Sequence, residues 1–230
     1  MVRRGFSFIE LVVSIVVIGI AFMSIPLVLR ETEKTLTLSI QQEAVMAGIT
    51  QMVNIMSYRW DEQNTDDARN GGSAKVLDTF NTTALECNNY SGSRRRIGHF
   101  IGNLRRRCYN TQVDATPIAN LGSDSNDMDD IDDIIASNSS LLTGTTNHTT
   151  DYKNSYTFDL NVEYVNDNLG LTNFSQAVLT GSISTTSATI PTSIKMVTLT
   201  ISSPQTDNTI RLRAFAANIG EVQYLSRPFQ

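Results

Sequence analysis

The stretch that decides the fold is residues 3–30, RRGFSFIELVVSIVVIGIAFMSIPLVLR. Residues 6–29 are almost entirely apolar and carry a single charge, that of Glu10. At about 1.5 Å per residue, a helix of this length crosses the roughly 30 Å hydrocarbon layer of a membrane. A charged group inside a spanning helix costs about 2.5 kcal/mol or more. The sequence therefore predicts a membrane helix whose carboxylate has a partner.

Two ordinary explanations account for only part of this segment. A secretory signal peptide has an apolar core of roughly 7–15 residues followed by a small-residue cleavage site, whereas this core is longer and Glu31-Thr32-Glu33-Lys34 follows it. A plain membrane anchor explains the length and the basic residues Arg3 and Arg4, but it does not explain Glu10. The positive-inside rule places the Arg3/Arg4 end in the cytoplasm and the rest of the chain outside.

The order Gly5-Phe6-Ser7-Phe8-Ile9-Glu10, with arginines before it and an apolar helix after it, resembles the processing motif of the type IV prepilin family. The resemblance covers residues 3–29. It implies that a membrane prepilin peptidase cuts between Gly5 and Phe6 and that the new amino terminus at Phe6 is N-methylated. Glu10 would then be the fifth residue of the mature chain, the family's assembly carboxylate.

Elementary electrostatics agrees with that reading of Glu10. Cleavage creates a positive amine at Phe6 near lipid, and a carboxylate on a neighbouring subunit neutralises it, so that each charge has a partner. Gly19 falls where family members carry a helix-softening glycine, and Pro26 removes a backbone N–H from the helix. We expect a local unwinding or a simple kink at these two residues.

Behind the apolar segment, the pattern predicts a helix and then strands. Val45, Ile49, Met52 and Met56 recur at helical spacing, which predicts a packing face on the continuing helix. Period-two alternation predicts half-buried antiparallel strands, which we place at residues 156–164, 177–184, 197–201 and 210–216.

We therefore predict an α+β protein with a long N-terminal helix on an antiparallel sheet of about four strands, which the resemblance identifies as the pilin fold. We expect four parts. They are a leader peptide at 1–5, a transmembrane and assembly helix at 6–29, its amphipathic continuation at 30–60, and a periplasmic or extracellular globular head at 61–230.

An arginine-rich segment lies in the less regular middle of the chain. Its apolar residues from Ile97 to Cys108 share one face of a helix predicted over 94–108. The arginines form either a phosphate-binding patch for DNA or local ion pairs. Stacking aromatic residues are scarce there, which disfavours nucleic acid. We expect the partners of the arginines to be a run of aspartates further along the chain.

That acidic run is a weak candidate for a calcium site, because closely spaced carboxylates are the ligands calcium prefers. Its candidate ligands are Asp127, Asp129, Asp130, Asp132 and Asp133. The order of an EF-hand loop is absent, so a solvated loop is the alternative. We expect no other cofactor.

The two cysteines, Cys87 and Cys108, are 21 residues apart in the polar part of the chain. An outward topology places them in an oxidising compartment, which favours a disulfide. A pair of free thiols is the alternative, and a zinc site with His99 or His148 fits no standard spacing.

No catalytic motif is present, so we expect no enzyme. Residues 127–220 loosely resemble minor pilins of the mannose-sensitive haemagglutinin type. The resemblance implies pilus assembly or adhesion, with prepilin peptidase, other pilin subunits, the inner-membrane assembly platform and membrane lipid as partners. It also implies a single-pass inner-membrane precursor that moves to the pilus. A pseudopilin of a type II secretion system and a non-polymerising membrane-anchored binding module are the alternatives.

Overall fold

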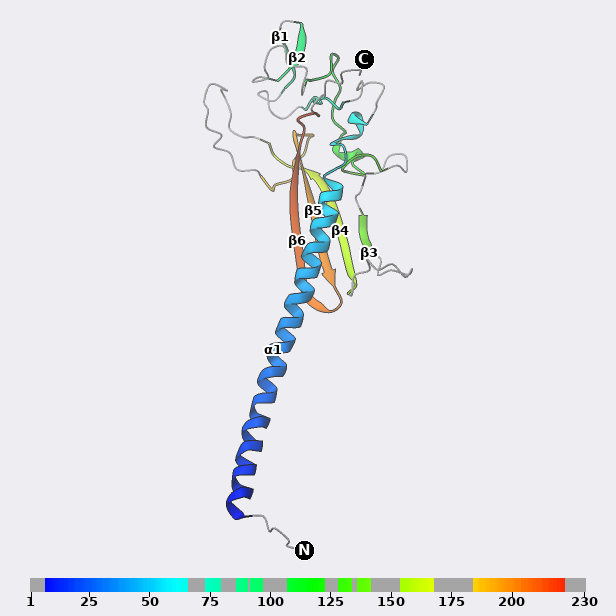
Figure 1. The fold of residues 1–230 in the computed structure, drawn as a ribbon. Helices are drawn as coiled ribbons and strands as arrows, with labels where there is room; N and C mark the ends of the chain where they lie inside the picture. The colour runs from blue at the N-terminus through cyan, green and yellow to red at the C-terminus, as the bar shows by residue number, and fades with distance from the viewer. Residues whose placement is uncertain are drawn as a thin grey trace, which may run out of the picture. The chain divides into compact units, whose positions relative to one another are not determined.

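The computed structural model of the chain describes residues 7–65, 73–79, 86–90, 92–96, 107–122, 128–133, 136–141, 154–167 and 184–221. Its elements, in chain order, are α1 (Phe8–Ile55), η1 (Glu62–Asn64), β1 (Asn88–Tyr90), β2 (Ser93–Arg95), η3 (Ile118–Asn120), β3 (Ala136–Leu141), β4 (Tyr156–Tyr164), β5 (Ile194–Ser203) and β6 (Thr206–Ala217) (Figure 1). The chain divides into two compact units, Met1–Met46 and Ala47–Gln230, and α1 runs through both. We call the second unit the head.

The helix α1 ends at Ile55, a few residues before the predicted end. Its last turn tightens, because Ser57 N donates to Asn54 O at 3.0 Å and Tyr58 N donates to Ile55 O at 3.1 Å. Such shorter bonds satisfy carbonyls that a helix end leaves without partners. The chain then enters η1, where the Asp61 carboxylate accepts a hydrogen bond from Gln63 N at 3.1 Å.

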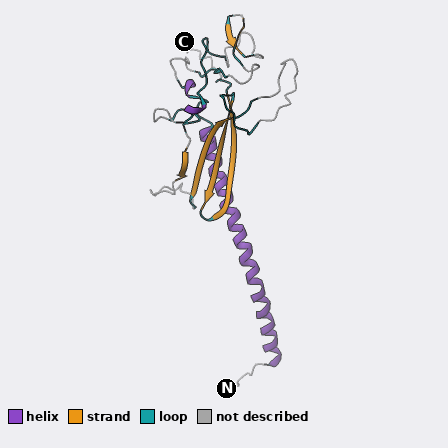
Figure 2. Cartoon of the chain, turned by 180° about the vertical axis from the view of Figure 1, so that it is seen from behind, coloured by secondary structure: helices purple, strands orange, loops and turns teal. Residues whose placement is uncertain are grey.

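A four-stranded antiparallel sheet forms the body of the head, in the order β3-β4-β5-β6 (Figure 2). Neighbours in the sheet are also neighbours in sequence, so the sheet is a meander, and its four strands agree with the predicted number. The apolar residues of β4 are all buried and alternate with more exposed polar residues, as predicted. They pair with the apolar face of β5, as in Phe158 opposite Ile201 and Leu160 opposite Leu199.

The fourth strand is β3, which the hydrophobic pattern did not predict. Its sequence, ASNSSL, is mostly small and polar, so it carries no period-two signal. Most of the predicted strand at 177–184 lies outside the described residues, and Ser184 is in no strand.

Within the head, small residues of α1 face the sheet. Ala47, Gly48 and Ile55 are buried, whereas Ile49 is 45% exposed. A Cβ added at Gly48 would collide with Ile201 Cδ1 and lie 2.9 Å from Leu212 Cδ1. The predicted packing face is therefore wrong at Ile49, whereas Val45, Met52 and Met56 are half-buried beside it. The helix packs so closely at Gly48 that this position needs a residue without a side chain.

A hairpin replaces part of the predicted arginine-rich helix. β1 pairs with β2 in antiparallel register, so that Asn89 lies opposite Arg94. Gly92, with φ +83°, lies in the connecting turn, a conformation that side-chain-bearing residues rarely adopt. At the other end of the predicted helix, Cys108 forms a parallel bridge with Val76. The helix predicted over 94–108 is thus wrong at both ends, and residues 97–106 lie outside the described residues.

Candidate functional sites in the helix and the head

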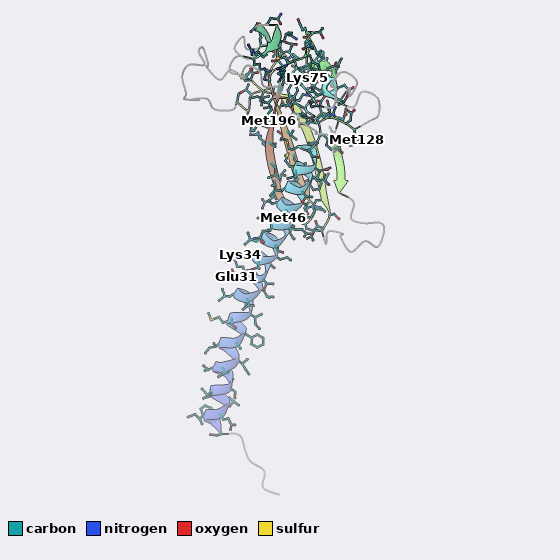
Figure 3. All side chains as sticks on the ribbon, turned by 45° about the horizontal axis from the view of Figure 1, so that its top comes forward. Glu31, Lys34, Met46, Lys75, Met128 and Met196 are labelled. Atoms are coloured by element: carbon teal, nitrogen blue, oxygen red, sulfur yellow. A yellow bond between two sulfur atoms is a disulfide. The ribbon has the colours of Figure 1, made fainter. Side chains whose placement is uncertain are left out.

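Within the first unit, residues 8–29 of α1 form an apolar stretch with one acidic residue, Glu10, in the first turn of the helix. Residues 7–30 are all exposed, and Figure 3 shows side chains projecting around the ribbon. By length and composition α1 is a candidate membrane span. Glu10 is exposed between apolar neighbours, and within the described residues it forms no ion pair. Gly5 and Phe6, the predicted processing residues, lie outside the described residues.

The helix continues without interruption through Gly19 and Pro26. Pro26 has no N–H to donate to the carbonyl four residues earlier. Gly19 has no atom within 4 Å of the position where a Cβ would be added. In this single chain the predicted softening does not unwind the helix.

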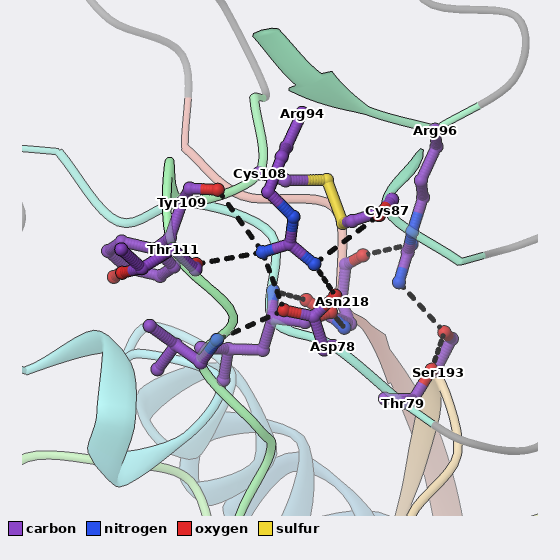
Figure 4. The surroundings of a disulfide bond; sticks show 12 residues. Asp78, Thr79, Cys87, Arg94, Arg96, Cys108, Tyr109, Thr111, Ser193 and Asn218 are labelled. Carbon is purple, nitrogen blue, oxygen red and sulfur yellow. Dashed lines mark hydrogen bonds and ion pairs between the residues drawn. A yellow bond between two sulfur atoms is a disulfide. The ribbon is translucent and has the colours of Figure 1, made fainter. Parts of the chain in front are cut away.

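The predicted disulfide is present in the head, where Cys87 and Cys108 are bonded with their Cα atoms 6.1 Å apart (Figure 4). Both cysteines are buried against Val76. The bridge joins the start of β1 to the segment that follows the hairpin, so it closes the loop that contains the arginines.

Arg94 is held beside that bridge by an acid from another segment. Its guanidinium pairs with both carboxylate oxygens of Asp78, at 2.6 and 3.0 Å. It also donates to Thr111 O at 2.7 Å and to Cys87 O at 3.3 Å. A bidentate pair of this kind fixes geometry as well as charge. Arg94 therefore organises the head around the disulfide.

Arg96 is buried and donates to Asn218 O at 2.6 Å and to Ser193 Oγ at 3.0 Å. Burial lowers the pKa of Arg96 to about 10, against the opposing attraction of Asp167 and Asp78. Neither Arg94 nor Arg96 pairs with the described part of the acidic run, Asp129 to Asp133, so the predicted partners are wrong there for these two residues. Arg105 and Arg106 lie outside the described residues.

The acidic run instead faces a buried lysine, Lys195 of β5, which is 0% exposed. Its Nζ donates to Trp60 O at 2.8 Å, to Asp61 Oδ2 at 3.0 Å and to Asp132 Oδ1. The ammonium also lies 4.7 Å from the centroid of the Trp60 ring and 5.4 Å from that of Tyr164. Burial alone would lower the pKa of Lys195, but attraction from the aspartates raises it overall.

Asp61 is the most heavily bonded carboxylate of this lysine network. It accepts hydrogen bonds from Thr116 N and Thr116 Oγ1, at 3.1 and 2.9 Å, and from Tyr164 Oη at 3.2 Å. Tyr164 Oη also lies 2.8 Å from Thr116 O. Burial and the nearby aspartates raise the pKa of Tyr164, so its hydroxyl stays protonated.

Two other aspartates of the run, Asp130 and Asp133, accept hydrogen bonds from nearby backbone N–H groups. Asp130 Oδ1 accepts from the N–H groups of Asp132 and Asp133, at 2.7 and 3.1 Å. Asp133 Oδ2 accepts from Asp129 N and Asp130 N, at 3.1 and 3.2 Å. These two carboxylates thus already have hydrogen-bond donors from the backbone. Among the described residues no group of three or more metal-binding side chains gathers, and Asp127 lies outside them.

Sequence reasoning missed the lysine network, although a signal was present. Residues 195, 197, 199 and 201 share one face of β5, and the last three are apolar and buried. A lysine on that face must have a buried partner. Which aspartates serve it depends on contacts between segments more than 60 residues apart.

No family model, curated protein or solved structure matches this chain.

Proposed function

We propose that this chain is a minor structural subunit of a type IV pilus-like filament, processed by a prepilin peptidase and anchored in the inner membrane before assembly. The observation that carries the proposal is the lone carboxylate in the first turn of an exposed, apolar α1. Glu10 stands four residues after Phe6, where the Gly5-Phe6 motif predicts a new positive terminus.

The partner of Glu10 in this proposal is the amine of Phe6 on a neighbouring copy. An isolated charge in lipid is costly, and pairing with an opposite charge offsets that cost. Assembly then brings together two groups that are each costly alone. This pairing favours a fixed axial register between neighbouring helices.

Two further observations support an outward-facing head. The Cys87–Cys108 disulfide is typical of an oxidising compartment. Arg3 and Arg4 precede the span, which favours a cytoplasmic amino terminus. The antiparallel sheet packed on the last turns of α1 is consistent with a pilin-like head.

The first test is the N-terminal peptide of the full chain recovered from a host with active prepilin peptidase. We expect a chain that starts at Phe6 with one added methyl group. A chain that still starts at Met1 or Val2 would contradict the proposal and favour a membrane-anchored module.

The second test separates assembly from insertion. We expect Glu10→Ala to insert and fold normally but to be strongly depleted from sheared filaments. Glu33→Ala is the matched control, because it removes an exposed carboxylate of the same helix outside the apolar stretch. Equal incorporation of both variants would contradict the role of Glu10.

A further inference from the structure

The lysine network of the head has a composition that ion pairing alone does not require. One amine, Lys195 Nζ, contacts two carboxylates from different segments, those of Asp61 and Asp132. The side chains of all three are at most 2% exposed. Two acids for one base leave an excess negative charge in the interior, where an unpaired charge is costly.

We propose that Lys195 and Asp132 are joined by an intramolecular amide (isopeptide) bond between Nζ and Cγ, with Asp61 moving the proton. The nucleophile contacts its carboxyl group, Asp61 lies 3.0 Å from the same nitrogen, and two aromatic rings exclude water from the pair. Held reactants of this kind react as an intramolecular pair, which greatly raises their effective concentration.

The reaction balances without a co-reactant. An ammonium and a carboxylate give an amide and one water molecule. Asp61 accepts one proton from the Lys195 ammonium and passes it to the Asp132 carboxylate, and the free amine attacks Cγ of that protonated carboxyl group. The Cγ–O bond breaks, and the oxygen leaves as water with this proton and a second proton that the nitrogen releases through Asp61.

The aspartates raise the pKa of Lys195 and so hold it as an ammonium, which must pass a proton to a carboxylate before it can react. Proton transfer from ammonium to carboxylate removes two charges, and a medium of low dielectric constant penalises charges. Asp130, bonded through Oδ1 to Asp132 N, holds a buried Oδ2 that has no hydrogen-bond partner. Burial, partly offset by Lys195, raises the pKa of Asp130 to about 8. A protonated carboxyl group is therefore available beside the reacting pair at neutral pH.

The hydrogen bonds favour Asp132, rather than Asp61, as the carboxyl group that forms the amide with Lys195. Asp61 is fixed by Thr116, Tyr164 and Gln63. Within the part of the chain that the structure describes, Asp132 Oδ2, the oxygen that would leave, accepts only a long hydrogen bond of 3.3 Å from Gly122 N. Loss of that oxygen therefore breaks one weak hydrogen bond, whereas amide formation at Asp61 would break several hydrogen bonds.

The product would tie β5 covalently to the segment 128–133, which is also held to Arg59 by a hydrogen bond of 2.9 Å from Ile131 N to Arg59 O. It would also remove one positive and one negative charge from the interior. This inference is independent of the proposed function, since the bond is read out whether or not the leader is cleaved.

The test is the mass of the full chain, extracted in detergent, with the disulfide reduced and alkylated and the N-terminal peptide identified separately. We expect a mass lower than that of the open chain by one water molecule. A tryptic digest should give a branched peptide that joins positions 132 and 195, with no cleavage after Lys195. A wild-type chain at full mass would overturn the proposal, and so would a branch at position 61.

Variants test the roles of the two partners. Lys195→Met should restore the full mass, and Asp61→Asn should accumulate open chain even though both bond-forming residues are present. Asp159→Asn changes an exposed aspartate of β4 and should keep the water deficit. An Asp61→Asn chain as fully linked as wild type would remove Asp61 from the reaction.

Discussion

Glu10 and Asp61 are both carboxylates set among apolar groups, yet they have opposite surroundings. Asp61 is 0% exposed and meets Lys195, Thr116 and Tyr164 from within the same unit. Glu10 is exposed on an apolar helix and, within the described residues, pairs with no cation. The head thus satisfies the charge of Asp61 internally, whereas the described residues offer Glu10 no partner of opposite charge.

The strongest way to break this comparison is to remove each carboxylate in turn. We expect Asp61→Ala to lower the free energy of unfolding by about 3–5 kcal/mol, because it removes the buried acceptor of hydrogen bonds from Lys195, Thr116 and Tyr164 together. Glu10→Ala should change it by less than about 0.5 kcal/mol, because an exposed site makes no such contacts. Urea unfolding of the full chain in detergent, followed by the fluorescence of Trp60, measures both. Trp60 is the one tryptophan of the chain and contacts the network directly. Equal losses of stability in the two variants would mean that Asp61 contributes no more to folding than the exposed Glu10.

The disulfide offers a second way to weaken the head alone. The Cys87→Ser/Cys108→Ser double variant should lower the free energy of unfolding by about 3 kcal/mol, from the loop-closure entropy of a 21-residue separation. The same loss should follow from reduction of the wild-type protein. A double variant that unfolds at the wild-type urea concentration would show that Arg94 and Asp78 already close this loop without the bond.

Two glycines of α1 sharpen the comparison within one element. Gly48→Leu should lower the free energy of unfolding by about 1–3 kcal/mol, because its side chain would be forced against Ile201 and Leu212. Gly19→Leu should leave the unfolding of the head unchanged, since nothing lies within 4 Å of the added Cβ. A Gly48→Leu chain of wild-type stability would mean that the helix moves away from the sheet at little cost.

The same contrast explains which predictions from sequence succeeded. The helix and the strands β4, β5 and β6 carry strong periodicity, because each has one long apolar face. β3 has none, so it was missed. The packing face of α1 was misplaced at Ile49, because a hydrophobic pattern points to large residues, whereas Ala47 and Gly48 are the residues buried there.

The candidate sites differ in how far apart their residues lie in the sequence, and this decides which of them could be predicted. The processing motif and Glu10 are contiguous in sequence, so they could be recognised there. The lysine network joins Trp60, Asp61, Asp132 and Lys195 from three distant segments, and no local pattern encodes that meeting. The pairing of Cys87 with Cys108 was predictable because only two cysteines exist.

The last prediction concerns Asp130, whose pKa is raised from 3.8 to about 8, chiefly by burial. Lys195 opposes that shift, and Asp132 and Asp133 add to it. Between about pH 4 and pH 8 the folded chain keeps a proton that the unfolded chain has released. This contribution to stability is therefore complete below about pH 4 and is lost as the pH rises toward 8, by about 1 kcal/mol per pH unit.

Asp130→Asn should remove this pH dependence, because the carboxamide stays neutral at every pH. We expect the variant to resemble wild type near pH 4 and to be the more stable protein at pH 8, in urea titrations followed by Trp60 fluorescence. Asp159→Asn, at an exposed position of β4, should keep the wild-type slope. Parallel slopes for Asp130→Asn and wild type would mean that Asp130 is ionised in the folded head. The head would then hold more carboxylates beside Lys195 than that one ammonium can neutralise. Like Glu10 of the helix, Asp130 would be a carboxylate without a cation of its own.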